Sequence, residues 1–259
     1  MKKVIAFDLD GTLAASKSPL ADRMSEVLSR LLDRFQVCVI SGGRFEQFQK
    51  QLLANLNVSP DKLEKLHLMP TCGTRYYTYN LAKKYWEKVY SEDFTSAEKK
   101  RISQAVDQAV DDLGMREKET YGELIEDRDS QMAFSALGQD IIDVLGEEGL
   151  KRKENWDPTN EKKAKLRDRI AELIPEFEVR SGGLTTIDIT KLGIDKAYGM
   201  KRLMELLEIS KEDILFFGDR IVEGGNDYPV KAAGIDSMQV SRWEDTALAL
   251  ESILAVVDN

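Results

Sequence analysis

The sequence predicts an α/β protein whose core is a doubly wound, Rossmann-like parallel sheet, interrupted by an inserted α+β domain. Near the N-terminus, short apolar runs that end in polar glycine turns alternate with segments of helical apolar spacing, which is typical of parallel sheets. From about residue 82 to residue 180 the chain is strongly charged and lacks this pattern, which resumes near residue 196. We therefore predict a core of residues 1–81 and 184–259 around an insert of residues 82–183.

The first predicted strand brings two carboxylates to an edge of the sheet. Residues 4–7 form a short apolar run, and Asp8 and Asp10 stand one residue apart before the turn at Gly11. In an open parallel sheet, ligands bind beyond the carboxyl ends of the strands, where these two acids lie. Because side chains alternate along a strand, Asp8 and Asp10 are expected to point the same way. Such a pair of like charges requires a cation or a shared proton.

The elements that follow continue the alternation of strands and helices. A second apolar strand ends at Ser41, Gly42 and Gly43, before a helix whose first backbone N–H groups would form an anion site. Alone this signal is weak, because Ser-Gly-Gly also marks ordinary turns. The predicted elements are a helix over residues 19–35, a strand over 36–40, a helix over 45–53, a strand over 66–69 and the start of a hairpin at 75–79.

The charged insert is predicted to carry its own sheet. Gly114 marks the end of its first helix, and Thr159 or Asn160 would cap its second. The charge of this segment is most simply that of a solvated surface. The predicted elements are a helix over residues 96–113, strands over 122–127 and 131–135, a helix over 160–173, and a hairpin of 177–180 with 185–189.

After the insert, a lysine and a second pair of acids return to the sheet edge. Lys196 opens a helix, either as an ordinary solvated lysine or as a point charge for a phosphate. Asp219 follows a buried strand, and together with Asp8 it would suit Mg²⁺, leaving Asp10 for proton transfer. The predicted elements are a helix over residues 196–207, a strand over 213–217, a helix over 227–233, a strand over 237–240 and a helix over 246–257.

Composition narrows the classes of function. The net charge of −9 and the pI near 5.0 argue against a general nucleic-acid binder and against an anionic membrane surface. Cys38 and Cys72 offer neither a disulfide framework nor a zinc motif, and His67 is expected to be structural. No run of the sequence is long and apolar enough for a signal peptide or a membrane span, so we expect a cytoplasmic protein.

Four of these motifs together resemble those of the haloacid dehalogenase (HAD) superfamily, in its Mg²⁺-dependent phosphotransferase branch. They are Asp8-Leu9-Asp10-Gly11-Thr12, Ser41, Lys196, and Gly218-Asp219 with Asn226-Asp227. The insert is similar to the cap of HAD subfamily IIB, which contains sugar phosphatases and eukaryotic-type phosphomannomutases. The stretch from Ser181 to Lys196 and the long loop from Gly218 to Asp227 most closely resemble the phosphomannomutase branch.

The resemblance implies a phosphoryl-transfer mechanism in the core. Asp8 would be the nucleophile that becomes an aspartyl phosphate, and Asp10 the general acid and base. Mg²⁺ would be held by the Asp8 carboxylate, the Asp10 backbone carbonyl and Asp219, while Asp227 orients the metal waters or Lys196. Ser41 and Lys196 would grip the transferred phosphoryl group, together with the Gly42–Gly43 turn.

In the cap, the resemblance implies contacts with the rest of the substrate. The residues are Arg128 as an anion contact, Ser135 and Asp188 as hydroxyl-binding groups, and Gln139 at a position of the distal phosphate clamp. The phosphomannomutase segment resembles Asn-Val-Ser-Pro-Ile-Gly-Arg, whereas this chain has Ala133 and Gln139 in place of its first and last residues. A mutase must bind a bisphosphate in both orientations. Loss of an arginine that binds the distal phosphate should therefore impair a mutase more than a phosphatase.

The sequence therefore favours a Mg²⁺-dependent phosphatase for a small phosphorylated metabolite, most simply a sugar phosphate. A phosphomannomutase-like phosphohexomutase is the nearest alternative. A non-catalytic sugar-phosphate-binding protein on the same fold is a third, but it predicts a broken motif, and all four motifs are intact. The chain is expected to be a monomer or a homodimer formed through the cap.

Overall fold

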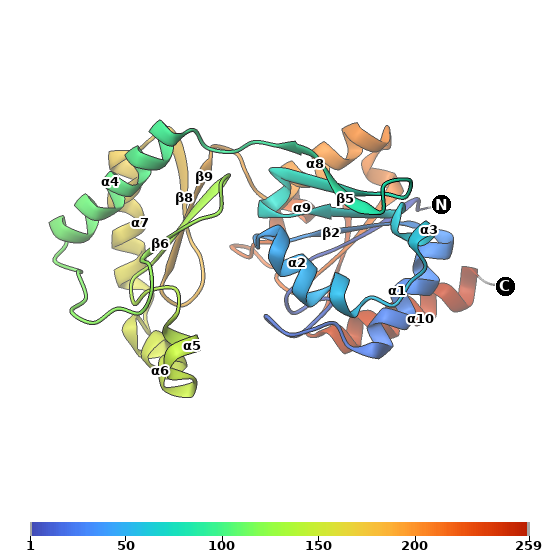
Figure 1. Ribbon diagram of the computed structural model, residues 1–259, viewed down its shortest axis with the longest axis horizontal. Helices are drawn as coiled ribbons and strands as arrows, with labels where there is room; N and C mark the ends of the chain where they lie inside the picture. Colours follow the sequence, from blue (N-terminus) through green and yellow to red (C-terminus); the bar gives the residue numbers. More distant parts are fainter. Residues whose placement is uncertain (1, 258–259) are drawn as a thin grey trace. The chain divides into compact units, whose positions relative to one another are not determined.

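The computed structural model describes residues 2–257, which form two compact units. The first unit contains the chain up to Ser91 and from Ile194 onward, and the second contains Glu92–Gly193. In Figure 1 the first unit combines the blue and teal start of the chain with its orange and red end, and the second is the green and yellow segment between them. The predicted fold class, an α/β core with an α+β insert, is confirmed.

The first unit is built on a seven-stranded sheet of order β11-β10-β1-β2-β3-β4-β5. The first five strands in this order are parallel, whereas β4 pairs antiparallel with both β3 and β5. The strands are β1 (Val4–Phe7), β2 (Gln36–Ile40), β3 (Leu66–Met69), β4 (Arg75–Asn80), β5 (Tyr85–Ser91), β10 (Ile214–Gly218) and β11 (Asp236–Gln239).

Helices cover both faces of this sheet, because the central strands are apolar on both sides. Ile5 and Phe7 of β1 belong to a core that includes residues of α1 and α10, while Val4 and Ala6 belong to a second core with residues of α8. Successive side chains of a strand point to opposite faces, so this division defines a doubly wound sheet. The helices are α1 (Asp22–Arg34), α2 (Phe45–Gln51), α3 (Pro60–Leu63), α8 (Lys196–Leu207), α9 (Tyr228–Ala232) and α10 (Trp243–Val257).

The second unit has an antiparallel sheet of order β6-β7-β9-β8. One face is apolar and packs with α4 and α7 into a separate core. The other face carries a polar cross-strand row in which Ala133 lies between Glu126 and Asp188, and Asp188 lies beside Arg180. The elements are α4 (Ser96–Asp112), β6 (Ile125–Asp127), β7 (Gln131–Ser135), α5 (Ile141–Leu145), α6 (Glu147–Trp156), α7 (Glu161–Leu173), β8 (Phe177–Ser181) and β9 (Thr186–Lys191).

The boundaries between the units lie ten residues later than residues 82 and 183, where we had placed them. At the first boundary, β5 belongs to the core sheet because it pairs with β4. At the second, β9 belongs to the insert because it pairs with both β7 and β8. β5 is an edge strand with polar residues on both sides, which conceals it among the charged residues of the insert.

Two local expectations in the insert also need correction. Helices α5 and α6 were not predicted, because Gly146, with φ of +57°, separates an apolar segment of only five residues from a short, strongly charged one. Asn160, one of the two expected residues, does occupy the N-cap position of α7, but its side chain makes no capping hydrogen bond. Instead the Asp157 carboxylate accepts hydrogen bonds from the backbone N–H groups of Lys162 and Lys163 at 3.1 and 2.8 Å, satisfying two orphan donors of the first turn.

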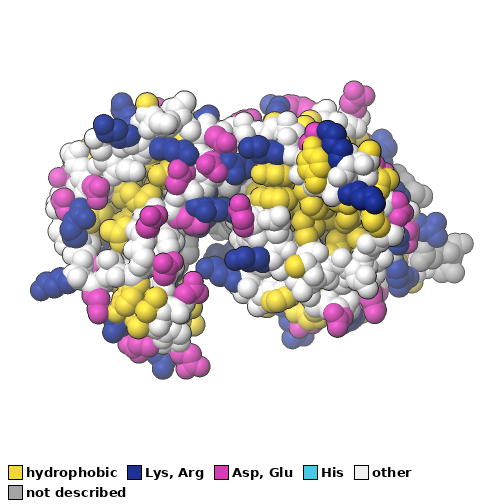
Figure 2. Space-filling model, in the orientation of Figure 1, with side chains coloured by type: hydrophobic (Ala, Val, Ile, Leu, Met, Phe, Trp, Pro, Cys, Tyr) yellow, Lys and Arg dark blue, Asp and Glu magenta, His cyan; other side chains and the backbone are white. Residues whose placement is uncertain are grey.

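The surface agrees with the acidic but mixed composition. Figure 2 shows acidic and basic side chains interspersed on the visible face, and hydrophobic side chains gathered near β4 and β5 of the first unit. Tyr85 and Val89 of β5 are among the exposed large hydrophobic residues. Within residues 2–257, no helix combines the length and the apolar composition needed to cross a membrane.

Candidate active site

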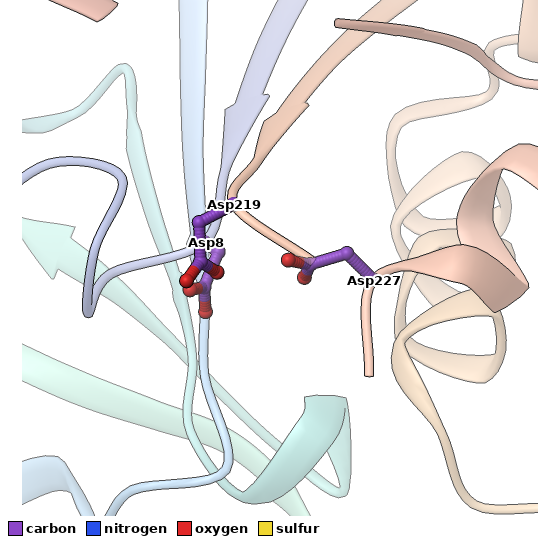
Figure 3. A group of neighbouring side chains, drawn as sticks. All are labelled: Asp8, Asp219 and Asp227. Carbon is purple, nitrogen blue, oxygen red and sulfur yellow. The ribbon is translucent and has the colours of Figure 1, made fainter. Parts of the chain in front are cut away.

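Two neighbouring strands of the core sheet end in carboxylates. Strand β1 ends at Phe7 and β10 at Gly218, so Asp8 and Asp219 leave adjacent strand ends. The backbone N–H of Asp8 donates to the carbonyl of Phe217 at 2.9 Å, which continues the pairing of the two strands to the site. Figure 3 shows the carboxylates of Asp8 and Asp219 side by side, with that of Asp227 pointing toward them. These three carboxylates offer oxygens within 4.8 Å of one another.

Lys196 joins this group from the first residue of α8. Asp195 caps that helix by accepting a hydrogen bond from the N–H of Tyr198 at 2.9 Å. The Lys196 ammonium donates to one oxygen of Asp8 and one of Asp227, each at 2.5 Å, and its side chain is only 1% exposed. Burial alone would lower the pKa of Lys196, but the two carboxylates outweigh it and raise the pKa, so the lysine is charged.

The site holds more negative than positive charge. Asp8 is 4% exposed, and burial raises its pKa from 3.8 to about 7; Lys196 works against this shift and Asp227 adds to it. Burial and the nearby charge of Asp227 likewise raise the pKa of Asp219. Among the described residues, the charges that oppose these three carboxylates are the Lys196 ammonium and, for Asp219, the guanidinium of Arg220, so a divalent cation would relieve the remaining repulsion. Carboxylate oxygens are ligands that Mg²⁺ prefers, and the donor set therefore fits this ion.

Gly11 keeps the space beside Asp219 open. Its φ is +83°, and a Cβ atom there would lie 2.6 Å from the Oδ2 atom of Asp219. Both the backbone conformation and the close approach therefore require glycine. The glycine of the Asp-x-Asp-Gly-Thr motif thus leaves room for the carboxylate of Asp219, one of the proposed metal ligands.

The Asp10 carboxylate has different partners from those of Asp8. Strand β1 ends at Phe7, so the alternation from which we expected Asp8 and Asp10 to point the same way does not extend to them. The Asp10 carboxylate accepts hydrogen bonds from the side chains of Gln47 and Gln51 and from the backbone N–H of Lys17. This leaves Asp10 outside the three-carboxylate group, although its backbone carbonyl is still available in our proposal for the metal.

The Ser41–Gly43 turn lies at the end of β2, next to β1 in the sheet. Ser41 is buried, and its Oγ atom accepts a hydrogen bond from the N–H of Gly43 at 3.3 Å. The turn is also held by the following loop, since the N–H groups of Thr71 and Cys72 donate to the carbonyls of Gly43 and Ser41 at 3.0 and 2.9 Å. The hydroxyl and the two glycines therefore sit on a well-tethered backbone.

Within the second unit, the four predicted substrate residues lie on or beside the polar side of the sheet. The Arg128 guanidinium pairs with Glu126 at 2.7 Å, and Ser135 is buried with its hydroxyl donating to the carbonyl of Gly138. The Gln139 carboxamide donates to the carbonyl of Ala133 at 2.8 Å, so it is held by the backbone in the middle of β7.

Asp188 differs from these because part of its carboxylate is unsatisfied. Its buried Oδ1 atom has no hydrogen-bond partner among the residues that the structure describes. Burial raises the pKa of Asp188, whereas the charge of Arg128 and a hydrogen bond from Gln131 lower it. A buried carboxylate oxygen without a donor is costly, and a ligand hydroxyl would satisfy it.

Other side chains near the site were either missed or have a structural role. Gln47 and Gln51 were not predicted as functional; only their spacing of four residues on α2, beside the Ser41–Gly43 turn, could have indicated them. His67 is buried between Tyr76 and Gln36, with ring nitrogens 2.7 and 2.8 Å from their side-chain oxygens. Burial lowers the pKa of His67 to about 4, so this residue is neutral and structural, as expected.

Comparisons with known proteins agree with this architecture. A family model described as haloacid dehalogenase-like hydrolase matches residues 5–230. A phosphomannomutase of Encephalitozoon cuniculi (strain GB-M1) is 26% identical over 262 residues, which cover 98% of this chain and 94% of the relative.

Solved structures support the same fold. An IMP-bound, N-terminally truncated IMP-nucleotidase of Plasmodium falciparum superposes with a TM-score of 0.67 at 18% identity, covering 98% of this chain and 68% of that one. A haloacid dehalogenase-like hydrolase from Bacteroides thetaiotaomicron superposes with a TM-score of 0.63, over 98% of this chain and 100% of that one.

Proposed function

Because this chain belongs to the haloacid dehalogenase-like hydrolases and is an enzyme that acts on phosphate esters, we propose that it is a Mg²⁺-dependent phosphatase. Its substrate is a small phosphorylated metabolite, a sugar phosphate, and its intermediate an aspartyl phosphate on Asp8. The observation that carries the proposal is the buried Asp8 carboxylate, which is fixed by Lys196 and lies beside Asp219 at the end of adjacent strands.

The geometry supports a nucleophilic role for Asp8. Its Oδ1 atom is bound to Lys196, so the rotation of the carboxylate is restricted and its other oxygen is the one that can attack phosphorus. Lys196 in turn is held by Asp227, whose second oxygen accepts the backbone N–H of Arg220 at 3.0 Å. This chain of contacts orients the nucleophile before the substrate binds, which reduces the cost of reaching the transition state.

The reaction then proceeds in two displacements. In the first, an Asp8 oxygen bonds to phosphorus while the ester oxygen leaves and takes a proton from Asp10. In the second, water attacks the phosphoryl group, gives a proton to Asp10 and releases inorganic phosphate from Asp8. Lys196 and the Ser41 hydroxyl stabilise the charge on the phosphoryl oxygens. The Asp8 and Asp219 carboxylates and the Asp10 carbonyl would hold Mg²⁺, which offsets repulsion between carboxylate and phosphate.

Residues of the cap support a phosphatase rather than a mutase. The similarity to phosphomannomutases favours a mutase as the second candidate. Against it, Gln139 stands where the resemblance expects an arginine, and its carboxamide is engaged with the backbone of β7. Arg128 is the residue of the cap that we expect to contact the substrate anion, and its guanidinium is paired with Glu126. A neutral carboxamide cannot replace the bidentate contact of a guanidinium with a phosphate.

A product analysis tests the proposal. The enzyme is incubated with mannose 1-phosphate, Mg²⁺ and a hexose bisphosphate activator, and both inorganic phosphate and hexose 6-phosphate are measured over time. We expect free phosphate and free sugar in equal amounts, and no turnover with EDTA. Formation of the 6-phosphate without free phosphate would instead assign the protein as a mutase.

A further inference from the structure

Two carboxamides on one face of α2 grip the carboxylate of Asp10. The side-chain N–H of Gln47 donates to Oδ2 of Asp10 at 2.7 Å, and that of Gln51 donates to Oδ1 at 3.1 Å. The backbone N–H of Lys17 donates to the same Oδ1 at 2.7 Å. Residues four apart on a helix lie next to each other, so a single helix face presents both amides to one carboxylate.

The position of the Gln47 side chain depends on the glycine at residue 43. Its Oε1 atom lies over the α-carbon of Gly43, at only 1.8 Å from the position that a Cβ atom would take there. The NH₂ end of the same carboxamide faces Asp10. Gln47 therefore connects the phosphate-binding turn of our proposed site with its proton carrier, and it fits only because residue 43 is glycine.

Gln51 is fixed in a similar way. It is buried, and besides Asp10 its amide donates to the backbone carbonyl of Ser18 at 3.0 Å. Ser18 lies in the loop that begins at Gly11. The same loop contains Lys17, whose backbone N–H donates to Asp10. The two glutamines thus hold the carboxylate from α2, and the loop after β1 holds it from the other side.

We propose that Gln47 and Gln51 are positioning residues for proton transfer by Asp10. This inference rests on the proposed phosphatase function. All three contacts are donors, and together they engage both oxygens of Asp10, so they fix the plane and the position of the carboxyl group that gives up and takes back the proton. The same contacts fix the position from which the Asp10 carboxylate accepts a proton from the attacking water. Misplacing a catalytic group by about 1 Å can lower the rate about 100-fold.

The test compares substrates that differ in their need for the acid. An alkyl or sugar phosphate must have its leaving oxygen protonated, whereas p-nitrophenolate leaves without help. In Gln47→Leu we expect kcat for the sugar phosphate to fall about 100-fold, the lower range for general acid–base catalysis, with KM unchanged. With p-nitrophenyl phosphate, the first turnover should remain fast and hydrolysis slow, giving a burst of p-nitrophenolate equal to the enzyme concentration.

Three further variants make the result specific. Gln47→Glu keeps the size of the side chain but replaces the donor by an acceptor, so it should fail as Gln47→Leu does. Gln47→Lys restores a donor of similar reach and should recover much of the activity. Gln49→Leu alters an exposed glutamine of the same helix and should behave as wild type.

The possible outcomes separate the two proposals. If Gln47→Leu and Gln47→Glu match Gln49→Leu, or if they lower the first turnover of both substrates equally, the positioning role is wrong while the phosphatase remains. If the wild-type protein releases no p-nitrophenolate with Mg²⁺, the proposed function itself fails and the positioning role fails with it. Equal urea midpoints for Gln47→Glu and wild type exclude misfolding as the cause of a lost activity.

Discussion

Replacing Lys196 with methionine should destabilise the protein, and more strongly at pH 8 than at pH 6. Methionine keeps most of the volume but removes the ammonium that contacts both Asp8 and Asp227. Removing one partner of a buried ion pair leaves an uncompensated charge and typically costs about 3–5 kcal/mol. We expect the free energy of unfolding to fall by that order in metal-free buffer.

The pH dependence follows from the pKa of Asp8, which is about 7 in the folded protein against an ordinary 3.8. The folded protein holds this proton more tightly than the unfolded chain, so unfolding free energy falls as pH rises from about 4 to about 7. Above about pH 7, Asp8 of the folded wild type releases its proton, and the unfolding free energy stops falling. In Lys196→Met the pKa of Asp8 should be higher still, because the neighbouring positive charge is gone. The unfolding free energy of this variant therefore continues to fall above pH 7. Between pH 6 and pH 8 the unfolding free energy of Lys196→Met therefore falls further than that of the wild type. The difference corresponds to about one additional pH unit of proton release, or about 1.4 kcal/mol.

Urea unfolding in EDTA at the two pH values measures this difference. A Trp156→Phe background leaves Trp86 and Trp243, both in the first unit, as the fluorescent probes. Lys201→Met, which changes an exposed lysine of the same helix, is the control and should show no pH-dependent loss. A Lys196→Met destabilisation that is below 1 kcal/mol, or equal at both pH values, would refute the reasoning about the buried charges.

Three other changes have defined outcomes. Asp219→Asn should weaken Mg²⁺ binding at least about tenfold by isothermal titration calorimetry, because a hard cation loses a charged oxygen ligand; unchanged affinity would remove Asp219 from the metal site. Gly11→Ala should cost at least about 1 kcal/mol in urea unfolding, because residue 11 has φ of +83° and its Cβ would contact Asp219; wild-type stability would show that the turn adapts. Gln139→Arg should increase the ratio of hexose 6-phosphate to free phosphate with a bisphosphate activator; an unchanged ratio would mean that residue 139 does not set the outcome.

Much of the core could be predicted because its signals are local and periodic. β2 and β3 are apolar runs between clear turn residues, and both have the predicted bounds. Parallel strands bring their carboxyl ends to one edge, so the proximity of Asp8 and Asp219 followed from topology alone. The contact of Lys196 with Asp8 required the fold, because a lysine in a first helical turn is usually solvated.

The parts that escaped prediction lack such signals. β5 is an edge strand whose partly exposed and partly charged side chains show no regular alternation of apolar and polar residues, so only its pairing with β4 reveals it. The orientation of Asp10 depends on where β1 stops, and sequence patterns place element ends least reliably. The role of Gln47 and Gln51 was hidden because uncharged carboxamides on a helix surface carry no pattern of their own, and only the folded contacts show what they hold.

The aspartyl phosphate on Asp8 is the central claim, and it can be trapped directly. Enzyme turning over p-nitrophenyl phosphate is quenched in acid and treated with borohydride, which reduces an acyl phosphate to an alcohol, and its peptides are read by mass spectrometry. We predict homoserine at position 8 when Mg²⁺ is present, and aspartate there when Mg²⁺ is removed by EDTA. Homoserine at another position, or unmodified Asp8 during confirmed turnover, would contradict the account.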